Sequence, residues 1–167
     1  MIKLLTKYII NFIVLIFVQV FILNNFQFGG FINPYIYVLF ILILPFETPK
    51  WFLLIIAFLL GFSIDIFSHT PGMHSSATVF MAFSRVQMLK TLSPRDGYET
   101  ETTPSIKDYG GKWFLKYTIV LVFIHHIFLF YIEVFSFSDF FITFFRATIS
   151  TLFSVALIMV IQFFYKK

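Results

Sequence analysis

Six long apolar runs, separated by short polar or charged stretches, dominate this sequence and limit what it can fold into. Their approximate ranges are 4–23, 31–46, 51–68, 73–92, 113–135 and 140–165. About 20 apolar residues in a helix cross the hydrocarbon core of a bilayer. An outer-membrane barrel is excluded, because its strands alternate apolar and polar residues over about ten positions. The runs predict an all-α integral membrane protein with six transmembrane helices in a single domain.

The composition excludes a soluble globular protein. Of the 167 residues, 59% are hydrophobic and only 12% are charged, whereas soluble domains average about 45–50% and about 25%. The six runs leave room for one polar loop, at 93–112, and for no extramembrane domain. The chain has no cysteine, so disulfides, thiolate metal sites and thiol nucleophiles are excluded.

The distribution of Lys and Arg predicts the orientation, because cytoplasmic loops of membrane proteins are enriched in these residues. With the N-terminus in the cytoplasm, ten of the twelve fall on the cytoplasmic side: Lys3, Lys7, Lys50, Lys90, Arg95, Lys107, Lys112, Lys116, Lys166 and Lys167. We therefore expect both termini and the 93–112 loop in the cytoplasm. The first run is expected to be a retained helix, since no small-x-small cleavage site follows it and a second run begins almost at once.

Ionisable residues inside the runs are candidate functional residues, because burying a charge in lipid is costly. Asp65, Glu133 and Arg146 are expected in the outer half of the membrane, with Arg146 roughly 9 Å deep. We predict an intramembrane polar cluster in which Arg146 meets Asp65, Glu133 or both. His126 shares a helix face with Glu133 and extends this cluster inward. The alternative is that Asp65 and Glu133 are simply solvated at the interface.

Other polar and small residues have simpler interpretations. Arg85 is expected to extend its guanidinium to the nearby cytoplasmic interface, and His125 points about 100° away from His126. Small residues let membrane helices approach closely. On this basis the predicted helix-packing residues are Gly61, Gly72, Ala82, Ala147, Ser150 and Ser154.

No pattern in the sequence indicates a catalytic, cofactor-binding or metal site. HExxH, GxSxG and phosphate-binding glycine loops are absent, and each of these carries a specific chemistry. Only one aspartate, Asp65, lies at membrane depth, whereas an aspartyl intramembrane protease needs two. A Ser/His site remains open, because Ser68, His69, His74 and Ser75 lie near one mouth of the bundle. We expect a protein that is not an enzyme and does not bind nucleic acid.

The sequence resembles the rod shape-determining protein MreD family in its Bacteroidota form. The resemblance rests on Gly61-Phe62-Ser63-Ile64-Asp65, on Pro71-Gly72-Met73-His74, and on His125-His126. It extends to the segments 33–39, 44–49 and 92–99. The order and number of the apolar runs agree with the family over the whole chain.

The resemblance implies a non-enzymatic scaffold of the cell-elongation machinery in the bacterial inner membrane. Such a protein determines rod shape through peptidoglycan synthesis, together with the bitopic protein MreC, the actin-like MreB and the peptidoglycan synthases. It also implies a six-helix fold similar to the substrate-binding subunits of energy-coupling-factor vitamin transporters. The alternative function is therefore a vitamin-binding transporter subunit. Against it, the first run contains no Gly, Ala or Ser for docking.

Overall fold

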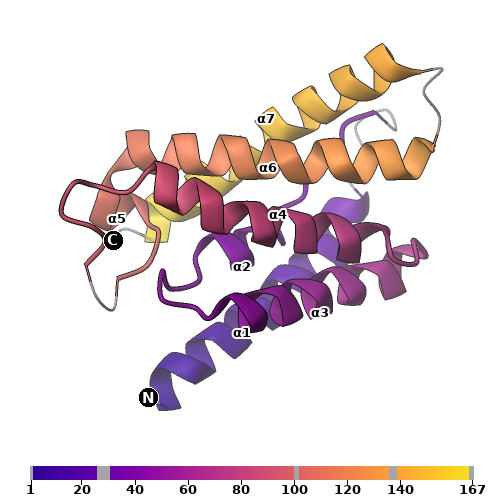
Figure 1. Cartoon of the computed structure of the whole chain (residues 1–167). Coiled ribbons are helices and arrows are strands. Elements are labelled where there is room, and N and C mark those ends of the chain that lie inside the picture. The colour runs from indigo at the N-terminus through magenta and orange to yellow at the C-terminus, as the bar shows by residue number, and fades with distance from the viewer. Residues whose placement is uncertain (1, 26–30, 100–101, 136–138, 166–167) are drawn as a thin grey trace.

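The computed structural model describes residues 2–25, 31–99, 102–135 and 139–165, and every regular element among them is helical (Figure 1). The five long helices are α1 (Ile2–Phe21), α3 (Lys50–Ser68), α4 (Met73–Thr91), α6 (Gly111–Val134) and α7 (Phe140–Tyr165). Three short elements connect them: the 3-10 helix η1 (Leu23–Asn25), α2 (Leu39–Leu42) and α5 (Ile106–Tyr109).

Four helical stretches are long and apolar enough to cross a membrane, as expected for an integral membrane protein. They are Thr6–Asn25, Lys50–Ser68, Gly111–Val134 and Phe140–Phe164. The fifth long helix, α4, has 19 residues and is less apolar, since His74, Arg85 and Lys90 accompany five Ser or Thr residues in it. Large apolar side chains cover the outer faces of this bundle, among them Ile13, Phe62 and Phe141, which are 59%, 46% and 84% exposed. A surface of this kind is compatible with lipid and not with water.

The second apolar run, 31–46, does not form the helix that we expected from its composition. Only Leu39–Leu42 is α-helical. Residues 33–36 form no regular element, and residues 37–38 turn into the short helix. Pro34 keeps the residue before it out of the helical region, and Pro45 ends the short helix. An extended chain advances about 3.3 Å per residue, against 1.5 Å in a helix. The run therefore covers a given length of the bundle with fewer residues than a continuous helix would need.

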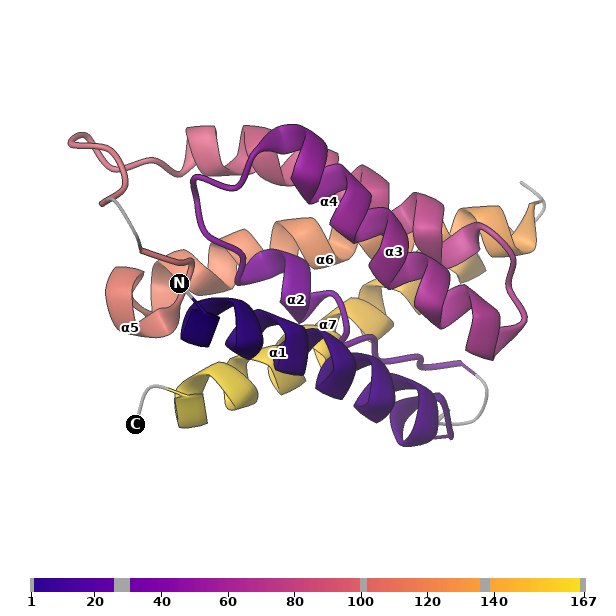
Figure 2. The same cartoon turned by 90° about the horizontal axis from the view of Figure 1, so that it is seen from below.

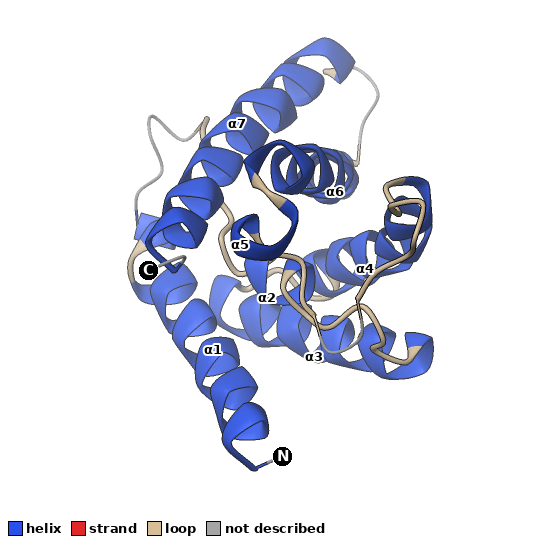
Figure 3. Ribbon diagram, turned by 90° about the vertical axis from the view of Figure 1, so that its left-hand side faces the viewer, coloured by secondary structure: helices blue, strands red, loops and turns tan. Residues whose placement is uncertain are grey.

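The long helices pack side by side around this segment. α4 contacts both α3 and α6, and α6 contacts α7, while α1 lies along α3 and α2. Figure 2 shows α2 between α1 and α6, and Figure 3 shows the helices viewed from one end of the bundle. The main apolar core consists of the buried faces of α3, α4, α6 and α7 closed around residues 36–44.

The two ends of the bundle differ in composition. The N- and C-termini lie at the same end (Figures 1 and 2), where α3 and α6 begin and α4 ends. We call this the lysine-rich end, because Lys7, Lys50, Lys90 and Lys112 lie there. At the other end, which we call the opposite end, α3 turns into α4, and α6 is followed by α7.

The 93–112 loop forms an ordered aromatic cap on the lysine-rich end within the part that is described. The ring of Tyr98 stacks on that of Phe46, with 4.0 Å between centroids and 9° between planes. Its hydroxyl donates to the carbonyl of Leu89 at 2.7 Å, and the indole N–H of Trp113 donates to Leu92 at 3.1 Å. Burial raises the pKa of Tyr98 to about 12.

Candidate functional site

The most unusual feature of the molecule is the stretch 33–44, in which only the four residues of α2 are helical and which we call the buried segment. All of its residues except Tyr35 and Ile43 are buried. Backbone N–H and C=O groups at membrane depth must be hydrogen-bonded within the protein, because lipid offers no partners. The candidate site is therefore this segment together with the polar side chains that satisfy its backbone.

Two serines near the middle of α7 bind the backbone of the buried segment. The Ser150 hydroxyl accepts the N–H of Asn33 at 3.1 Å, and the Ser154 hydroxyl accepts the N–H of Tyr35 at 2.8 Å. The sequence predicted both serines as helix-packing residues. The structure places them in contact with non-helical backbone, and both are completely buried.

Gln19 of α1 binds the same segment from the other side. Its Oε1 accepts the N–H of Ile36 at 2.8 Å, and its Nε2 donates to the carbonyl of Pro34 at 3.1 Å. The side chain is fully buried and replaces the two hydrogen bonds that a neighbouring strand would supply. Sequence reasoning missed Gln19, although an amide inside an otherwise apolar run was a sign of such a role.

Toward the lysine-rich end, Arg85 of α4 binds the last carbonyls of the segment. Its guanidinium donates to the carbonyls of Leu44 and Pro45 and, through Nε, to the hydroxyl of Tyr117 at 2.8 Å. Tyr117 in turn donates to the carbonyl of Leu42 at 3.0 Å. The expectation that Arg85 reaches the interface is wrong, since only 1% of it is exposed. Fixed carbonyl acceptors inside the bundle take the place of interfacial water.

Asp65 lies at the junction of α3 and α4 and binds the first turn of α4. One carboxylate oxygen accepts the hydroxyl of Thr70 at 3.0 Å and the N–H of His74 at 2.9 Å. The other accepts the N–H of Ser75 at 3.0 Å and the Ser75 hydroxyl. The residue that precedes α4, Gly72, has no side chain to cap it. Asp65 satisfies the free amides of this helix, and its negative charge is favourable at a helix N-terminus.

Gly61, one turn before Asp65, allows α4 to approach. A Cβ at this position would lie 2.5 Å from the His74 carbonyl oxygen and from the Ser75 Cα. No side chain fits at that distance from backbone atoms. The Gly-x-x-x-Asp pattern therefore fixes one junction, with glycine providing the close contact and aspartate the hydrogen bonds.

Gly72 was predicted to pack against a helix, and the structure gives a different reason for it. A Cβ on Gly72 would have no neighbour within 4 Å, but its φ is +85°. This left-handed conformation is accessible to glycine at no steric cost. The prediction for Gly72 is corrected accordingly: it shapes the α3–α4 turn and does not pack a helix. Ala82 and Ala147 are both fully buried, the first in the main core and the second beside Leu129 and Phe130.

Arg146 lies with one of the two carboxylates expected beside it. Its guanidinium is 3.3 Å from Glu133 and 4.5 Å from the centre of the Phe130 ring. The side chains of Arg146 and Glu133 are 18% and 40% exposed. Asp65 is directed to α4 and makes no hydrogen bond or ion pair with Arg146. Within the described residues, the structure thus brings together a pair and not the larger cluster.

His126 contacts the buried segment and not the Arg146–Glu133 pair. Its Nδ1 bonds the carbonyl of Val122 at 2.8 Å, and its Nε2 bonds the Ser154 hydroxyl at 3.1 Å. The ring of Tyr35 lies 5.4 Å from that of His126. His126 and Gln19 therefore contact the same stretch of chain, His126 at Tyr35 and Gln19 at Pro34 and Ile36.

His125 belongs to a second buried network, which centres on Tyr37. The Tyr37 hydroxyl lies 2.7 Å from His125 Nε2, 3.0 Å from His74 Nδ1 and 3.4 Å from the Thr78 hydroxyl. His74 also belongs to the Asp65 junction, so this network links α3, α4, α6 and the buried segment. Sequence reasoning did not find Tyr37, because a tyrosine in an apolar run looks like any other core aromatic.

A polar cavity of about 330 Å³ opens at the opposite end. Its walls include Asn24, Asn33, Thr70, His74, Glu133 and Arg146. Two buried polar atoms beside it, Asn33 Oδ1 and Arg146 Nε, have no hydrogen-bond partner among the described residues. Buried polar groups are normally paired, so the cavity has unused capacity to donate and to accept hydrogen bonds.

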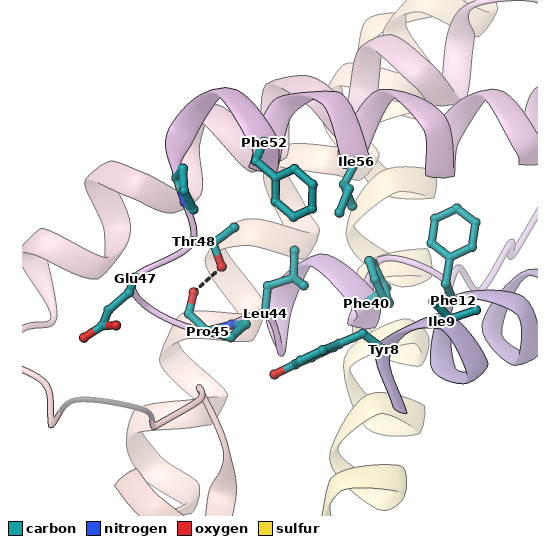
Figure 4. Close-up of a pocket in the computed structure, with 11 residues that line it drawn as sticks. Tyr8, Ile9, Phe12, Phe40, Leu44, Pro45, Glu47, Thr48, Phe52 and Ile56 are labelled. Carbon is teal, nitrogen blue, oxygen red and sulfur yellow. Dashed lines mark hydrogen bonds between the residues drawn. The ribbon is translucent and has the colours of Figure 1, made fainter. Parts of the chain in front are cut away.

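A second cavity, of about 500 Å³, lies between α1, α2 and α3 and is apolar (Figure 4). Phe52 and Ile56 of α3 point toward Tyr8 of α1 and Phe40 of α2. Glu47 and Thr48 lie at its lysine-rich end, where the Thr48 hydroxyl donates to the Pro45 carbonyl at 2.6 Å. Its lining offers hydrogen-bonding groups at that end only.

Comparison with known proteins adds no relative: no protein-family model, curated protein or solved structure matches the chain. Among the described residues, no three His, Asp or Glu side chains are grouped so that they could hold a metal ion. The site binds the protein's own backbone, through hydrogen bonds made by Gln19, Arg85, Ser150 and Ser154.

Proposed function

We propose that the chain is a non-enzymatic membrane scaffold of the bacterial cell-elongation machinery, of the MreD kind. The observation that carries the proposal is the use made of Gly61 and Asp65, two of the residues on which the resemblance to that family rests. Both are committed to the contact between α3 and α4, one by its missing side chain and the other by four hydrogen bonds. A motif used to join two helices favours a structural role over a chemical one.

The proposal includes six membrane crossings with both termini in the cytoplasm. The buried segment supports the second crossing, since its first residue lines the polar cavity at the opposite end and its last carbonyl binds Arg85 toward the lysine-rich end. The concentration of Lys and Arg at one end supports the orientation. In this arrangement the polar cavity faces the periplasm, and the aromatic cap faces the cytoplasm.

The proposed partners are an MreC-like bitopic protein, and through it MreB and the peptidoglycan synthases. The apolar outer faces of α1, α3 and α7 support an association within the membrane, because a partner helix can pack on them as well as lipid does. The proposed location is the inner membrane, where the machinery for cell elongation works.

Affinity purification tests this function. The tagged protein is extracted from native membranes in mild detergent, and the co-purifying proteins are identified by mass spectrometry. We expect a bitopic coiled-coil protein and cell-wall synthases, and a loss of both when Gly61 is replaced by alanine. Gly111→Ala is the matched control, since a Cβ there would have no neighbour within 4 Å. Recovery of neither partner with the unmodified protein would contradict the proposal.

The alternative function, a vitamin-binding transporter subunit, is favoured by the polar cavity. Its volume suits a small molecule, and Asn33 Oδ1 and Arg146 Nε are free to bind one. The same purification separates the two functions, because a transporter subunit would bring with it ATPase subunits and a coupling membrane protein. Recovery of those subunits would contradict the scaffold function and support vitamin uptake.

A further inference from the structure

A third hollow, separate from the two cavities above, lies between α3 and α4 near the lysine-rich end. It has a volume of about 380 Å³ and is lined by Lys50, Leu53, Leu54, Phe83, Val86, Gln87 and Lys90. The two lysines come from different helices, Lys50 from the start of α3 and Lys90 from the last turn of α4. The lining thus combines two cations and one amide with four apolar side chains.

The two lysines carry charge that the protein itself does not neutralise. Both are exposed, and neither forms an ion pair or a side-chain hydrogen bond within the described part of the chain. The nearest carboxylate in sequence to Lys50 is Glu47, which lines the apolar cavity on the α1 side of α3. The first amides of α3 add partial positive charge beside Lys50, and the last carbonyls of α4 add partial negative charge beside Lys90, so the two ammonium groups set the sign. The mouth of the groove is therefore positive.

The rest of the groove is apolar and runs toward the middle of the bundle. Phe83 is 67% exposed, and Leu54 and Val86 are half-buried. Phe83 lies seven residues before Lys90, which is about 10 Å along a helix. Trp51, also 67% exposed, marks the level of Lys50 as the interface, where tryptophan is enriched. The groove therefore begins at headgroup level and continues into the acyl region.

From these observations we propose that the groove between α3 and α4 binds an anionic phospholipid of the adjoining leaflet. The headgroup phosphate lies between the ammonium groups of Lys50 and Lys90, and one acyl chain lies against Leu54, Phe83 and Val86. Basic pockets between membrane helices recognise anionic headgroups in this way. The α3–α4 pair is thereby held at both ends, by Asp65 at one and by the lipid at the other.

The test is a lipid titration of the full chain in detergent, followed by native mass spectrometry. Phosphatidylglycerol is compared with phosphatidylethanolamine of the same acyl chains. The charge variant is the double substitution Lys50→Gln and Lys90→Gln. Its matched control is Lys107→Gln with Lys112→Gln, which removes two exposed lysines at the same end outside the groove. Val86→Trp fills the apolar part and leaves both cations in place.

We expect phosphatidylglycerol to bind the unmodified protein and the control equally. The charge variant should bind it roughly 30-fold more weakly, the effect of two lysines near an anionic headgroup. Val86→Trp should also weaken binding, and free glycerol phosphate should not compete. Equal binding of phosphatidylethanolamine, or equal losses in the charge variant and its control, would overturn the proposal. Competition by free glycerol phosphate, with no effect of Val86→Trp, would assign the lysines to a soluble anion and overturn it as well.

Discussion

Asp65 and Ser75 lie on different helices and are joined twice through a single carboxylate oxygen. Oδ2 of Asp65 accepts both the backbone N–H of Ser75, at 3.0 Å, and the Ser75 hydroxyl. The other oxygen binds Thr70 and His74. Asp65 thus caps a helix that it does not belong to, and its cap also fixes the angle at which α3 meets α4. This junction makes the clearest predictions about stability.

Replacement of Asp65 by asparagine should lower the free energy of unfolding by about 2–3 kcal/mol. The amide keeps the shape of the carboxylate but loses its charge, and its NH2 group would face donors. Thermal unfolding in detergent and the level of protein in the membrane measure the effect. Ser63→Ala on the same helix is the control, because its hydroxyl bonds only within α3. Equal stability of Asp65→Asn and the control would contradict this role.

Gly61→Ala should destabilise the protein more than Gly111→Ala does. The added methyl group at Gly61 would lie 2.5 Å from backbone atoms of α4, so the two helices must separate. Overpacking of this kind typically costs about 1–3 kcal/mol. At Gly111 the methyl group meets nothing within 4 Å. Comparison of the two unfolding midpoints tests the close approach directly.

Arg85→Met should destabilise the protein strongly, by about 3 kcal/mol or more. Methionine fills much of the volume but leaves the carbonyls of Leu44 and Pro45 without their donor, and unpaired buried groups are costly. Arg95→Met, at an exposed position, should have little effect. If Arg85 instead extended to the interface, the two variants would behave alike in thermal unfolding.

Arg146→Ala should have a smaller effect than Asp65→Asn, about 1 kcal/mol or less. Its partner Glu133 is 40% exposed, and exposed ion pairs contribute little. The same unfolding assay ranks the two positions, with Glu133→Gln as the matched removal of the partner. If Arg146→Ala lost more stability than Asp65→Asn, the Arg146–Glu133 ion pair would be the main polar contact at the opposite end, contrary to this prediction.

Stability should fall at alkaline pH as the phenol of Tyr98 ionises. Burial raises its pKa to about 12 in the folded protein, above the value of about 10 of an exposed tyrosine. The folded state therefore favours the protonated form. Its stabilising contribution is complete below pH 10 and is lost as the pH rises toward 12. Tyr98→Phe should show a smaller loss over this range in detergent, and an identical loss would contradict the raised pKa of the half-buried phenol.

Much of the framework could be predicted from the sequence, because charge and proline bound the apolar runs that became α1, α3, α6 and α7. The spacing of Gly61 and Asp65 also indicated one helix face directed at a neighbour. The spacing did not indicate which element is the neighbour. Asp65 was assigned to Arg146 on depth alone, whereas the first turn of α4 lies closer and offers uncapped amides.

The buried segment could not be predicted, because apolar content does not distinguish a helix from an extended chain enclosed by protein. The distinction lies in Gln19 of the preceding helix and in Ser150 and Ser154, which are 117 and 119 residues away from their partners in the chain. Arg85 illustrates the same limit. A position near a helix end allows both an interfacial and a buried guanidinium, and the choice depends on carbonyls about 40 residues earlier.

The buried segment also has a consequence for how the protein is made. The N–H of Asn33 finds its partner on Ser150, 117 residues later in the chain. At typical rates of synthesis this interval lasts roughly 6–23 s. During that time the backbone N–H groups of Asn33 and Tyr35 lack their serine acceptors on α7. We therefore expect the buried segment to reach its final place only after the last helix has been made.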